Sequence, residues 1–252
     1  MQGLVAGRRA VDGDLDMKLF VSGTDTGIGK TVVTCSLLRA LNSRGMSAIG
    51  MKPVAAGVNA QGTWDDVEQI RDASPLAAAL EHVAPYRLRA AASPHFAAQE
   101  DGIAIQEAVV LAALVRLEQL AEMVVIEGVG GFRVPLSPGL DSADLAKTIG
   151  APVLLVVPMR LGCINHALLT AEAIAGRGLT LVGWVANAGI DPDYSRVALT
   201  ADTISGRLHA TCVGILPQLA HLDFGQSGAD HLNIDRLLIG LRSQQTTHRR
   251  CP

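Results

Sequence analysis

The sequence has 252 residues, of which 49% are apolar and only 3% aromatic, and its formal net charge is −3. This length and apolar content suit one large α/β domain, or at most two small ones. The near-balanced charge and the scarcity of aromatic rings argue against a surface that tracks nucleic acid, so we expect no nucleic-acid partner.

The cysteines and the apolar runs indicate the compartment. The four cysteines are Cys35, Cys163, Cys212 and Cys251. They form no C-x-x-C pair and no secretory leader precedes them, which favours reduced thiols in a cytoplasmic protein. No apolar run reaches the roughly 20 residues of a spanning helix, because Arg116, Glu118 and Glu122 interrupt the longest stretch, so we expect no membrane segment.

The chain ends differ from the middle. Residues 1–16 carry turn formers and charges without an apolar period, which predicts a disordered extension, with Met17 as an alternative start. We expect a single domain over residues 17–244 and a flexible tail over residues 245–252.

Apolar periodicity predicts alternating strands and helices. Strands are expected at residues 19–21, 48–51, 124–126, 153–157, 181–185 and 213–216, most of them continuous apolar runs that suit a parallel sheet covered on both faces. Helical patterns lie at residues 31–44, 66–72, 105–122 and 165–177. This alternation predicts a doubly wound α/β fold with a mostly parallel sheet and helices on both faces.

The section over residues 55–102 is less regular and is rich in glycine and proline. Long excursions at the carboxyl ends of parallel strands commonly build ligand sites. We therefore expect substrate contacts from this section.

The stretch "VSGTDTGIGKTVV" (residues 21–33) combines a strand, a glycine-bearing turn and a helix start. Backbone N–H groups and the helix dipole converge there on an anion, which predicts a phosphate-binding loop. Lys30 is expected to reach the β and γ phosphates and Thr31 to bind Mg²⁺. The strict G-x-x-x-x-G-K-[ST] pattern is missed by one residue, because Thr24 holds the first position and Gly23 precedes it.

Acidic residues elsewhere offer partners for a metal. Glu127 ends the apolar strand in "MVVIEG", and a carboxylate there can serve a phosphoryl-transfer site. Asp65 and Asp66 in "TWDDVEQ" offer a second ligand or, equally well, a helix N-cap.

The chain has four lysines against seventeen arginines, so lysine stands out where it occurs. Lys30 lies in the phosphate-binding loop and Lys52 ends a predicted strand. Both positions suggest a need for a compact ammonium group.

Seven motifs with a shared order and spacing lie within a region of resemblance that runs from about residue 18 to residue 219. They are "GTDTGIGKT" (23–31), "KPVAAG" (52–57), "SPH" followed by "AQE" (93–100), "EGVGG" (127–131), "PLS" (135–137), "LGCINHALLT" (161–170) and "GWVAN" (183–187). In these motifs the sequence resembles the dethiobiotin synthase family, which lies within the P-loop NTPase superfamily.

The resemblance implies an ATP- and Mg²⁺-dependent reaction in biotin biosynthesis. In that family 7,8-diaminopelargonic acid is carbamated by CO₂ without enzyme-bound biotin, and the carbamate oxygen attacks the γ-phosphate of ATP. The second amine closes the ureido ring on the carbamic–phosphoric anhydride, giving dethiobiotin, ADP and phosphate. Such chemistry needs charge neutralisation and positioning rather than a protein nucleophile.

The resemblance also implies roles for single residues. The catalytic residues would be Lys30, Lys52 and Thr26, and the Mg²⁺ ligands Thr31, Asp66 and Glu127. Nucleotide would be bound by Asp25, Thr26, Gly27, Ile28, Gly29, Lys30, Thr31, Val32, Asn187 and Pro217, with Asn187 on adenine. Substrate would be bound by Lys52, Ala56, Gly128, Val129, Gly130, Gly131, Leu161, Gly162, Cys163, Ile164 and Asn165, the last four presenting N–H groups to the substrate carboxylate across a homodimer interface.

Four residues depart from the family pattern. Gly27 replaces a loop glutamate, Ala56 a serine, Val129 an alanine, and Ala188 an acid. A lost serine hydroxyl removes a hydrogen bond worth about 0.5–1.5 kcal/mol net. Ala188 leaves the preferred nucleotide open.

Other interpretations compete with this one. Related amidotransferases of cobyrinic acid synthesis need a glutaminase domain, for which no room remains after Leu219. ATP-driven partition switches carry a signature lysine early in the loop, where this chain has Thr24 and Asp25. His95 and His166 are tempting general bases, but we interpret both as structural.

Overall fold

The computed structural model describes residues 17–219 and 228–248, with side chains described up to residue 243 in the last helix. The predicted disordered extension, residues 1–16, and residues 249–252 of the predicted flexible tail lie outside this description. Residues 245–248 of that tail belong to helix α10 (Ile234–His248).

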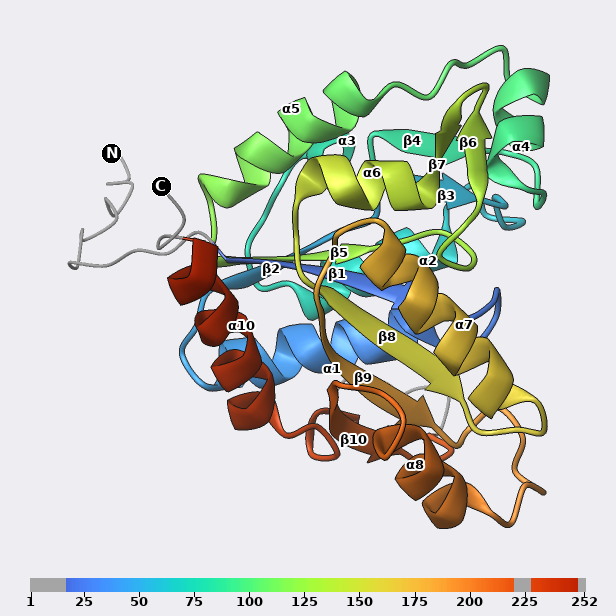
Figure 1. The fold of residues 1–252 in the computed structure, drawn as a ribbon. Coiled ribbons are helices and arrows are strands. Elements are labelled where there is room, and N and C mark those ends of the chain that lie inside the picture. Colours follow the sequence, from blue (N-terminus) through green and yellow to red (C-terminus); the bar gives the residue numbers. More distant parts are fainter. Residues whose placement is uncertain (1–16, 220–227, 249–252) are drawn as a thin grey trace.

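A six-stranded sheet with the strand order β10-β9-β8-β1-β5-β2 forms the centre of the molecule (Figure 1). All of its pairings are parallel. The strands are β1 (Met17–Gly23), β2 (Ala48–Met51), β5 (Met123–Glu127), β8 (Val153–Pro158), β9 (Leu181–Asn187) and β10 (Thr211–Leu216). The six predicted strands are therefore confirmed, each within the observed bounds.

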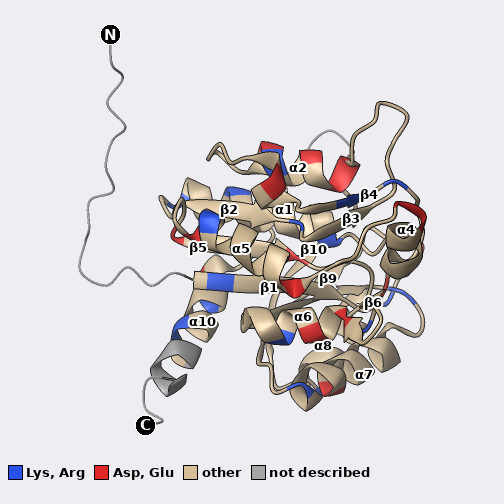
Figure 2. Cartoon of the chain, turned by 90° about the horizontal axis from the view of Figure 1, so that it is seen from above, with Lys and Arg blue, Asp and Glu red and all other residues tan. Residues whose placement is uncertain are grey.

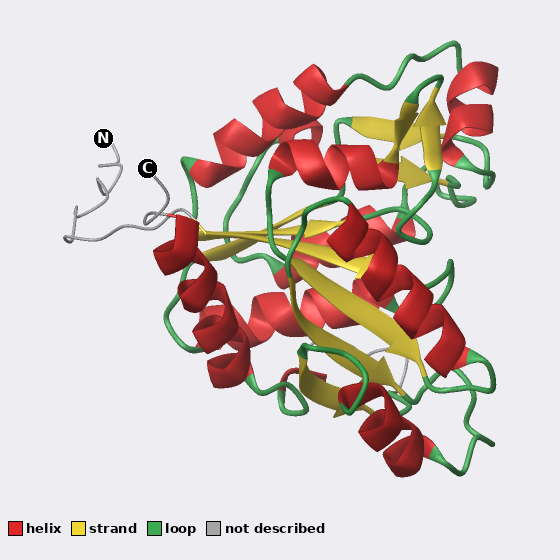
Figure 3. Ribbon diagram, in the orientation of Figure 1, coloured by secondary structure: helices red, strands yellow, loops and turns green. Residues whose placement is uncertain are grey.

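Helices cover both faces of the sheet, as predicted (Figure 3). The predicted helices are observed as α1 (Lys30–Ser43), α2 (Asp65–Ala73), α5 (Glu107–Glu118) and α7 (Cys163–Gly176). Helices that we did not predict are α3 (Leu80–Val83), α4 (Pro94–Glu100), α6 (Ser142–Ile149), α8 (Val197–Ser205) and α10.

The section over residues 55–102 contains more regular structure than its glycines and prolines suggest. Strand β3 (Val54–Ala56) pairs in parallel with β4 (Tyr86–Leu88), and α4 packs against both strands. A second small sheet joins β6 (Pro135–Ser137) and β7 (Leu140–Asp141). The two small sheets and α4 lie above the main sheet in Figure 1.

The core explains why the strands read as continuous apolar runs. Leu154 and Val156 of β8 belong to the main apolar cluster, whereas Leu155 and Val157 belong to a second cluster around Trp184. Successive side chains of a strand point to opposite faces, so both faces of β8 are buried. Within the described residues, no helix is long and apolar enough to cross a membrane.

Candidate active site

The loop between β1 and α1 has the geometry of a phosphate-binding loop. Gly27 and Gly29 adopt left-handed φ angles of 69° and 85°, which favour glycine because it has no Cβ. Helix α1 begins at Lys30 without a side-chain cap, so the N–H groups of its first turn remain available to an anion.

Asn187 holds this loop against the end of β9. Its Nδ2 donates to the carbonyl of Ile28 at 2.9 Å, and its Oδ1 accepts from the N–H of Gly189 at 3.1 Å. A Cβ at Gly29 would overlap Asn187 Nδ2. Glycine is therefore required at position 29 by close packing as well as by its φ angle.

The ammonium group of Lys30 lies folded back on the loop. Its Nζ donates to the carbonyl of Asp25 at 2.8 Å, and the residue is 7% exposed. Burial, followed by repulsion from Lys52, lowers the pKa of Lys30 to about 8. A negative charge bound beside Lys30 would stabilise the charged form of its ammonium group.

A buried charge cluster, which we define as Lys52, Glu127, Asp66 and Thr31, lies at the carboxyl edge of the sheet. Lys52 Nζ is 2.5 Å from Glu127 Oε1 and 2.9 Å from Asp66 Oδ2. Thr31 Oγ1 donates to the same Glu127 Oε1 at 2.9 Å. Burial alone would lower the pKa of Lys52, but Glu127 and Asp66 outweigh burial and raise it, so Lys52 is a cation in this cluster.

The donor set of this cluster fits a magnesium ion. Glu127 Oε2 is buried without a hydrogen-bond partner, so one carboxylate oxygen is free for a ligand. Hydroxyl and carboxylate oxygens are the donors that Mg²⁺ prefers, and Mg²⁺ takes most of its remaining ligands from phosphates and water. Ligands from phosphate and water would be needed here, because the described part of the chain contains no group of three or more metal-binding His, Cys, Asp or Glu side chains.

The structure distinguishes the two neighbouring aspartates of α2. Asp66 Oδ2 contacts Lys52, whereas Asp65 is exposed and its Oδ1 accepts from Asn59 Nδ2 at 2.5 Å. In Figure 2 acidic positions, coloured red, recur along α2. The contact with Lys52 favours Asp66 over Asp65 as the member of the cluster.

The glycines of "EGVGG" pack against the phosphate-binding loop. Gly130 has a φ of 62°, and a Cβ there would lie 2.9 Å from Val134 Cγ2 and 3.4 Å from Thr26 Oγ1. A Cβ at Gly128 would lie 3.1 Å from the ring of Phe20. Side chains at these positions would push this segment away from Thr26.

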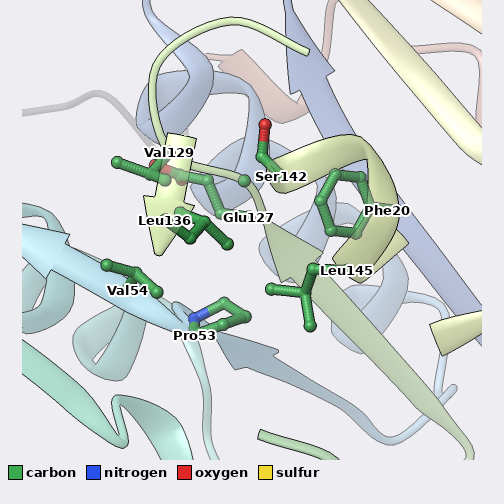
Figure 4. Close-up of a pocket in the computed structure, with 9 residues that line it drawn as sticks. Phe20, Pro53, Val54, Glu127, Val129, Leu136, Ser142 and Leu145 are labelled. Atoms are coloured by element: carbon green, nitrogen blue, oxygen red, sulfur yellow. The ribbon is translucent and has the colours of Figure 1, made fainter. Parts of the chain in front are cut away.

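A small cavity lies behind this segment (Figure 4). It offers about 10 Å³ to the centre of a water-sized sphere, the lower limit for one water molecule. Its walls include Phe20, Pro53, Glu127, Val129 and Leu145. The cavity is too small for an organic substrate, so we assign it to packing behind Glu127.

The segment 161–165 forms the exposed start of α7. Gly162 has a φ of 89°, Cys163 is buried, and Leu161 is 91% exposed. Arg160 lies 3.0 Å from Asp25 Oδ2, which brings this start beside the phosphate-binding loop. Ile164 is half-buried and Asn165 is exposed.

The remaining residues singled out from the sequence lie at strand ends and on helices around the site. Pro217 is exposed and directly follows Leu216, the β10 residue paired with Asn187. Ala56 ends β3, and Val32 lies half-buried in α1. His95 Nδ1 lies 3.1 Å from Ser93 Oγ, and His166 lies in the first turn of α7.

Sequence reasoning missed two residues that organise the site. Asn59 holds the loop before α2, and Arg160 pairs with the phosphate-binding loop. The turn-forming stretch "NAQG" was a local signal for Asn59. Arg160 had no such signal, because its partner lies 135 residues away in the sequence.

The parallel sheet and the glycine-rich loop before α1 define a P-loop nucleotide-binding α/β protein. The chain matches the AAA domain family over residues 17–226. It is 50% identical to an ATP-dependent dethiobiotin synthetase of Aromatoleum aromaticum, covering 83% of this chain and 94% of the relative. A relative of the same name from Nitrosospira multiformis is 48% identical over 79% and 87% of the two chains. The chain belongs to the ATP-dependent dethiobiotin synthetase family.

Solved structures of low sequence identity support the fold alone. The septum site-determining protein MinD of Pyrococcus horikoshii, complexed with Mg-ADP, superposes with a TM-score of 0.56 at 13% identity, covering 92% of this chain and 96% of that one. A ParA family ATPase from Chlorobium tepidum gives 0.53 at 9% identity, covering 91% and 98%.

Replacing Gly29 with alanine tests the packing of the loop. We expect Gly29→Ala to weaken ATP binding on the order of tenfold to a hundredfold, because the added Cβ displaces the loop from Asn187. Gly45→Ala is the matched control, since Gly45 has a similar φ of 81° but no atom within 4 Å of its Cβ position. Calorimetric titration with ATP makes the comparison; equal losses in both variants would contradict the packing argument.

The lowered pKa of Lys30 predicts a pH dependence. Lys30 is charged below pH 8 and neutral above it, and bound phosphates favour the charged form. ATP affinity should therefore fall as pH rises from 8 to 10, by up to about tenfold per pH unit, with proton uptake on binding. Calorimetry in two buffers of different ionisation enthalpy measures this uptake, and Lys30→Met should show a flat profile; a flat profile in the unaltered protein would refute the assignment.

Proposed function

We propose that this chain is an ATP- and Mg²⁺-dependent cyclo-ligase that closes the ureido ring of 7,8-diaminopelargonic acid with CO₂. Its products are dethiobiotin, ADP and phosphate, in biotin biosynthesis. The observation that carries the proposal is the buried charge cluster directly beside the phosphate-binding loop. The substrates are inferred from family membership. The cluster offers a lysine cation and oxygen donors, which suit phosphoryl transfer from a metal-bound nucleotide.

Two lysines neutralise charge in the proposed reaction. Lys30 moves from the carbonyl of Asp25 to the β and γ phosphates, and Lys52 faces the carbamate and the transferring phosphoryl group. Thr26 lies in the loop close to Gly130, where it can orient the γ-phosphate. The carbamate oxygen attacks phosphorus, ADP leaves, and the second amine then displaces phosphate from the carbonyl carbon. Fixed cations stabilise the charge that develops on these oxygens.

Thr31, Asp66 and Glu127 are proposed to hold Mg²⁺. When bound, the ion would neutralise the negative charge of the phosphates. Thr31 Oγ1 and Glu127 are already in contact, which places a hydroxyl and a carboxylate at one point.

The nucleotide is proposed to lie along residues 25–32 with adenine near Asn187 and Pro217. Each amide atom of Asn187 has one protein partner, which leaves one donor and one acceptor for the base. Ala188 supplies no acid beside the base, so selectivity among nucleotides depends on Asn187 and on backbone groups.

The diamine is proposed to lie between Lys52, Ala56 and the glycine segment 128–131. Its carboxylate would be bound by the N–H groups of residues 161–165 of a second copy in a cytoplasmic homodimer. The exposed side chains of Leu161 and Leu169, at 91% and 56%, support an interface on α7. An anion suits this helix start, because its N–H groups carry partial positive charge.

The proposal is tested by phosphate release from Mg·ATP with bicarbonate, with and without diaminopelargonic acid, together with mass detection of dethiobiotin. We expect release that depends on the diamine and equals dethiobiotin formed. Phosphate release that ignores the diamine would reject the ligase function and leave only nucleotide binding.

Replacing Lys52 with alanine tests its catalytic role. We expect kcat to fall about 10²- to 10³-fold, because a fixed cation at the reacting oxygens is lost. Lys147→Ala is the control, since Lys147 is exposed on α6. Thermal unfolding is measured alongside, because Glu127 loses its buried partner. Turnover equal to that of the control in a folded variant would show that Lys52 is not catalytic.

Restoring serine at position 56 tests the substrate side. Ala56→Ser should lower KM for the diamine about two- to twelvefold, the equivalent of one net hydrogen bond. KM for ATP should stay unchanged, as steady-state kinetics with each substrate varied in turn will show. An altered KM for ATP would mean that residue 56 lies on the nucleotide side.

A further inference from the structure

The loop over residues 57–64 is organised by one side chain, Asn59. Its Oδ1 accepts from the N–H groups of Gln61 and Thr63, both at 3.0 Å. Its Nδ2 donates to Thr63 Oγ1 at 2.8 Å and to Asp65 Oδ1 at 2.5 Å. An asparagine amide has two donors and two lone pairs, so the side chain uses its whole hydrogen-bonding capacity within the protein.

Helix α2 lacks a side-chain cap from its N-cap residue, although Asp66 Oδ1 accepts from the N–H of Val67 at 2.9 Å. Its N-cap residue is Trp64, which makes no side-chain cap hydrogen bond. The bond from Asn59 reaches Asp65, the first residue of the helix, and the indole of Trp64 donates to the carbonyl of Leu88 at 2.8 Å. These two contacts tie the start of α2 to the loop and to β4.

Fixing Asp65 also fixes the direction of Asp66. Neighbouring residues of a helix point about 100° apart, because 3.6 residues make one turn. With Asp65 held outward by Asn59, Asp66 is directed inward, where its Oδ2 lies 2.9 Å from Lys52 Nζ. Without this hold, the start of the helix is less closely fixed, and the distance from Asp66 Oδ2 to Lys52 Nζ is less closely fixed with it.

The geometry points to Asn59 as a positioning residue that acts through Asp65 to aim Asp66 at Lys52 and the metal position. This inference rests on the proposed function, since the role of Asp66 toward Mg²⁺ belongs to it. Groups that orient a metal ligand affect metal affinity on the order of 10- to 100-fold without touching the ion.

The first test measures the dissociation constant of ADP with excess Mg²⁺ and again with EDTA, by calorimetry on the full chain. The ratio of the two constants reports the contribution of Mg²⁺ and needs no turnover. We expect Asn59→Ala and Asp65→Ala to reduce this ratio about tenfold while affinity in EDTA stays unchanged. Thr63→Val, which removes one acceptor of Asn59 but not Asp65, is the matched control and should keep the ratio.

Asp65→Asn separates positioning from direct metal binding. Asparagine at position 65 keeps an oxygen that accepts from Asn59 but carries no charge, so the ratio should stay as in the unaltered protein. A ratio as low as that of Asp65→Ala would overturn the inference and make Asp65 itself the ligand. In an Asp66→Asn background, Asn59→Ala should have no further effect; an undiminished effect there would likewise overturn it.

A second readout is independent of metal and nucleotide. The chain has two tryptophans, and Trp184 is fully buried in the second apolar cluster, so Trp184→Phe leaves Trp64 as the only tryptophan, which is excited selectively over the two tyrosines. We expect Asn59→Ala and Asp65→Ala to shift the emission of Trp64 to longer wavelength, and Asp65→Asn to leave it unchanged. Unshifted emission in both alanine variants would contradict the inference that Asn59 fixes the start of α2. This readout does not depend on Mg²⁺, so it would still test Asn59 if the proposed metal role of Asp66 failed.

Discussion

The ion pair between the buried Lys52 and Glu127, with the buried ammonium group of Lys30 near it, is the constraint on which the site depends. Lys30, Lys52 and Glu127 are 7%, 4% and 1% exposed. Desolvation costs several kcal/mol for each buried ion. Lys52 keeps its charge because it is paired with Glu127, whereas burial lowers the pKa of Lys30, whose Nζ is bonded to the carbonyl of Asp25. The sheet order explains how they meet: β1, β5 and β2 are adjacent, Lys52 directly follows β2, Glu127 ends β5, and Lys30 follows the loop after β1.

This arrangement leaves the protein with a cation and an acceptor available for a ligand. Lys30 is bonded to a backbone carbonyl rather than to a carboxylate, and Glu127 Oε2 has no partner. In the proposed reaction both groups would gain from a metal–phosphate complex, since the phosphates would accept from the ammonium group and the metal would bind the carboxylate oxygen. The buried lysine and the unpartnered carboxylate oxygen are in place before any ligand binds.

Local sequence signals predicted the strands and the loop, whereas long-range contacts were not visible to them. The six strands could be predicted because both faces of the sheet are buried, and the loop because Gly29, Lys30 and Thr31 are contiguous. The capping box of Asp141 and Asp144 was a local signal for α6 that our prediction did not use. Asn187 bonds to Ile28 as well as to Gly189. The bond to Ile28 joins residues 159 positions apart in the sequence, so no local pattern could predict it.

The central claim is that a carbamate oxygen, not water, attacks the γ-phosphate of ATP. The most direct measurement supplies C¹⁸O₂ with the diamine and Mg·ATP, in a reaction short enough to limit exchange with water, and weighs the products by mass spectrometry. The account predicts one ¹⁸O in the released phosphate and one in the ureido carbonyl of dethiobiotin. Phosphate without ¹⁸O would mean that water attacks phosphorus, and would contradict the proposed coupling of ATP to ring closure.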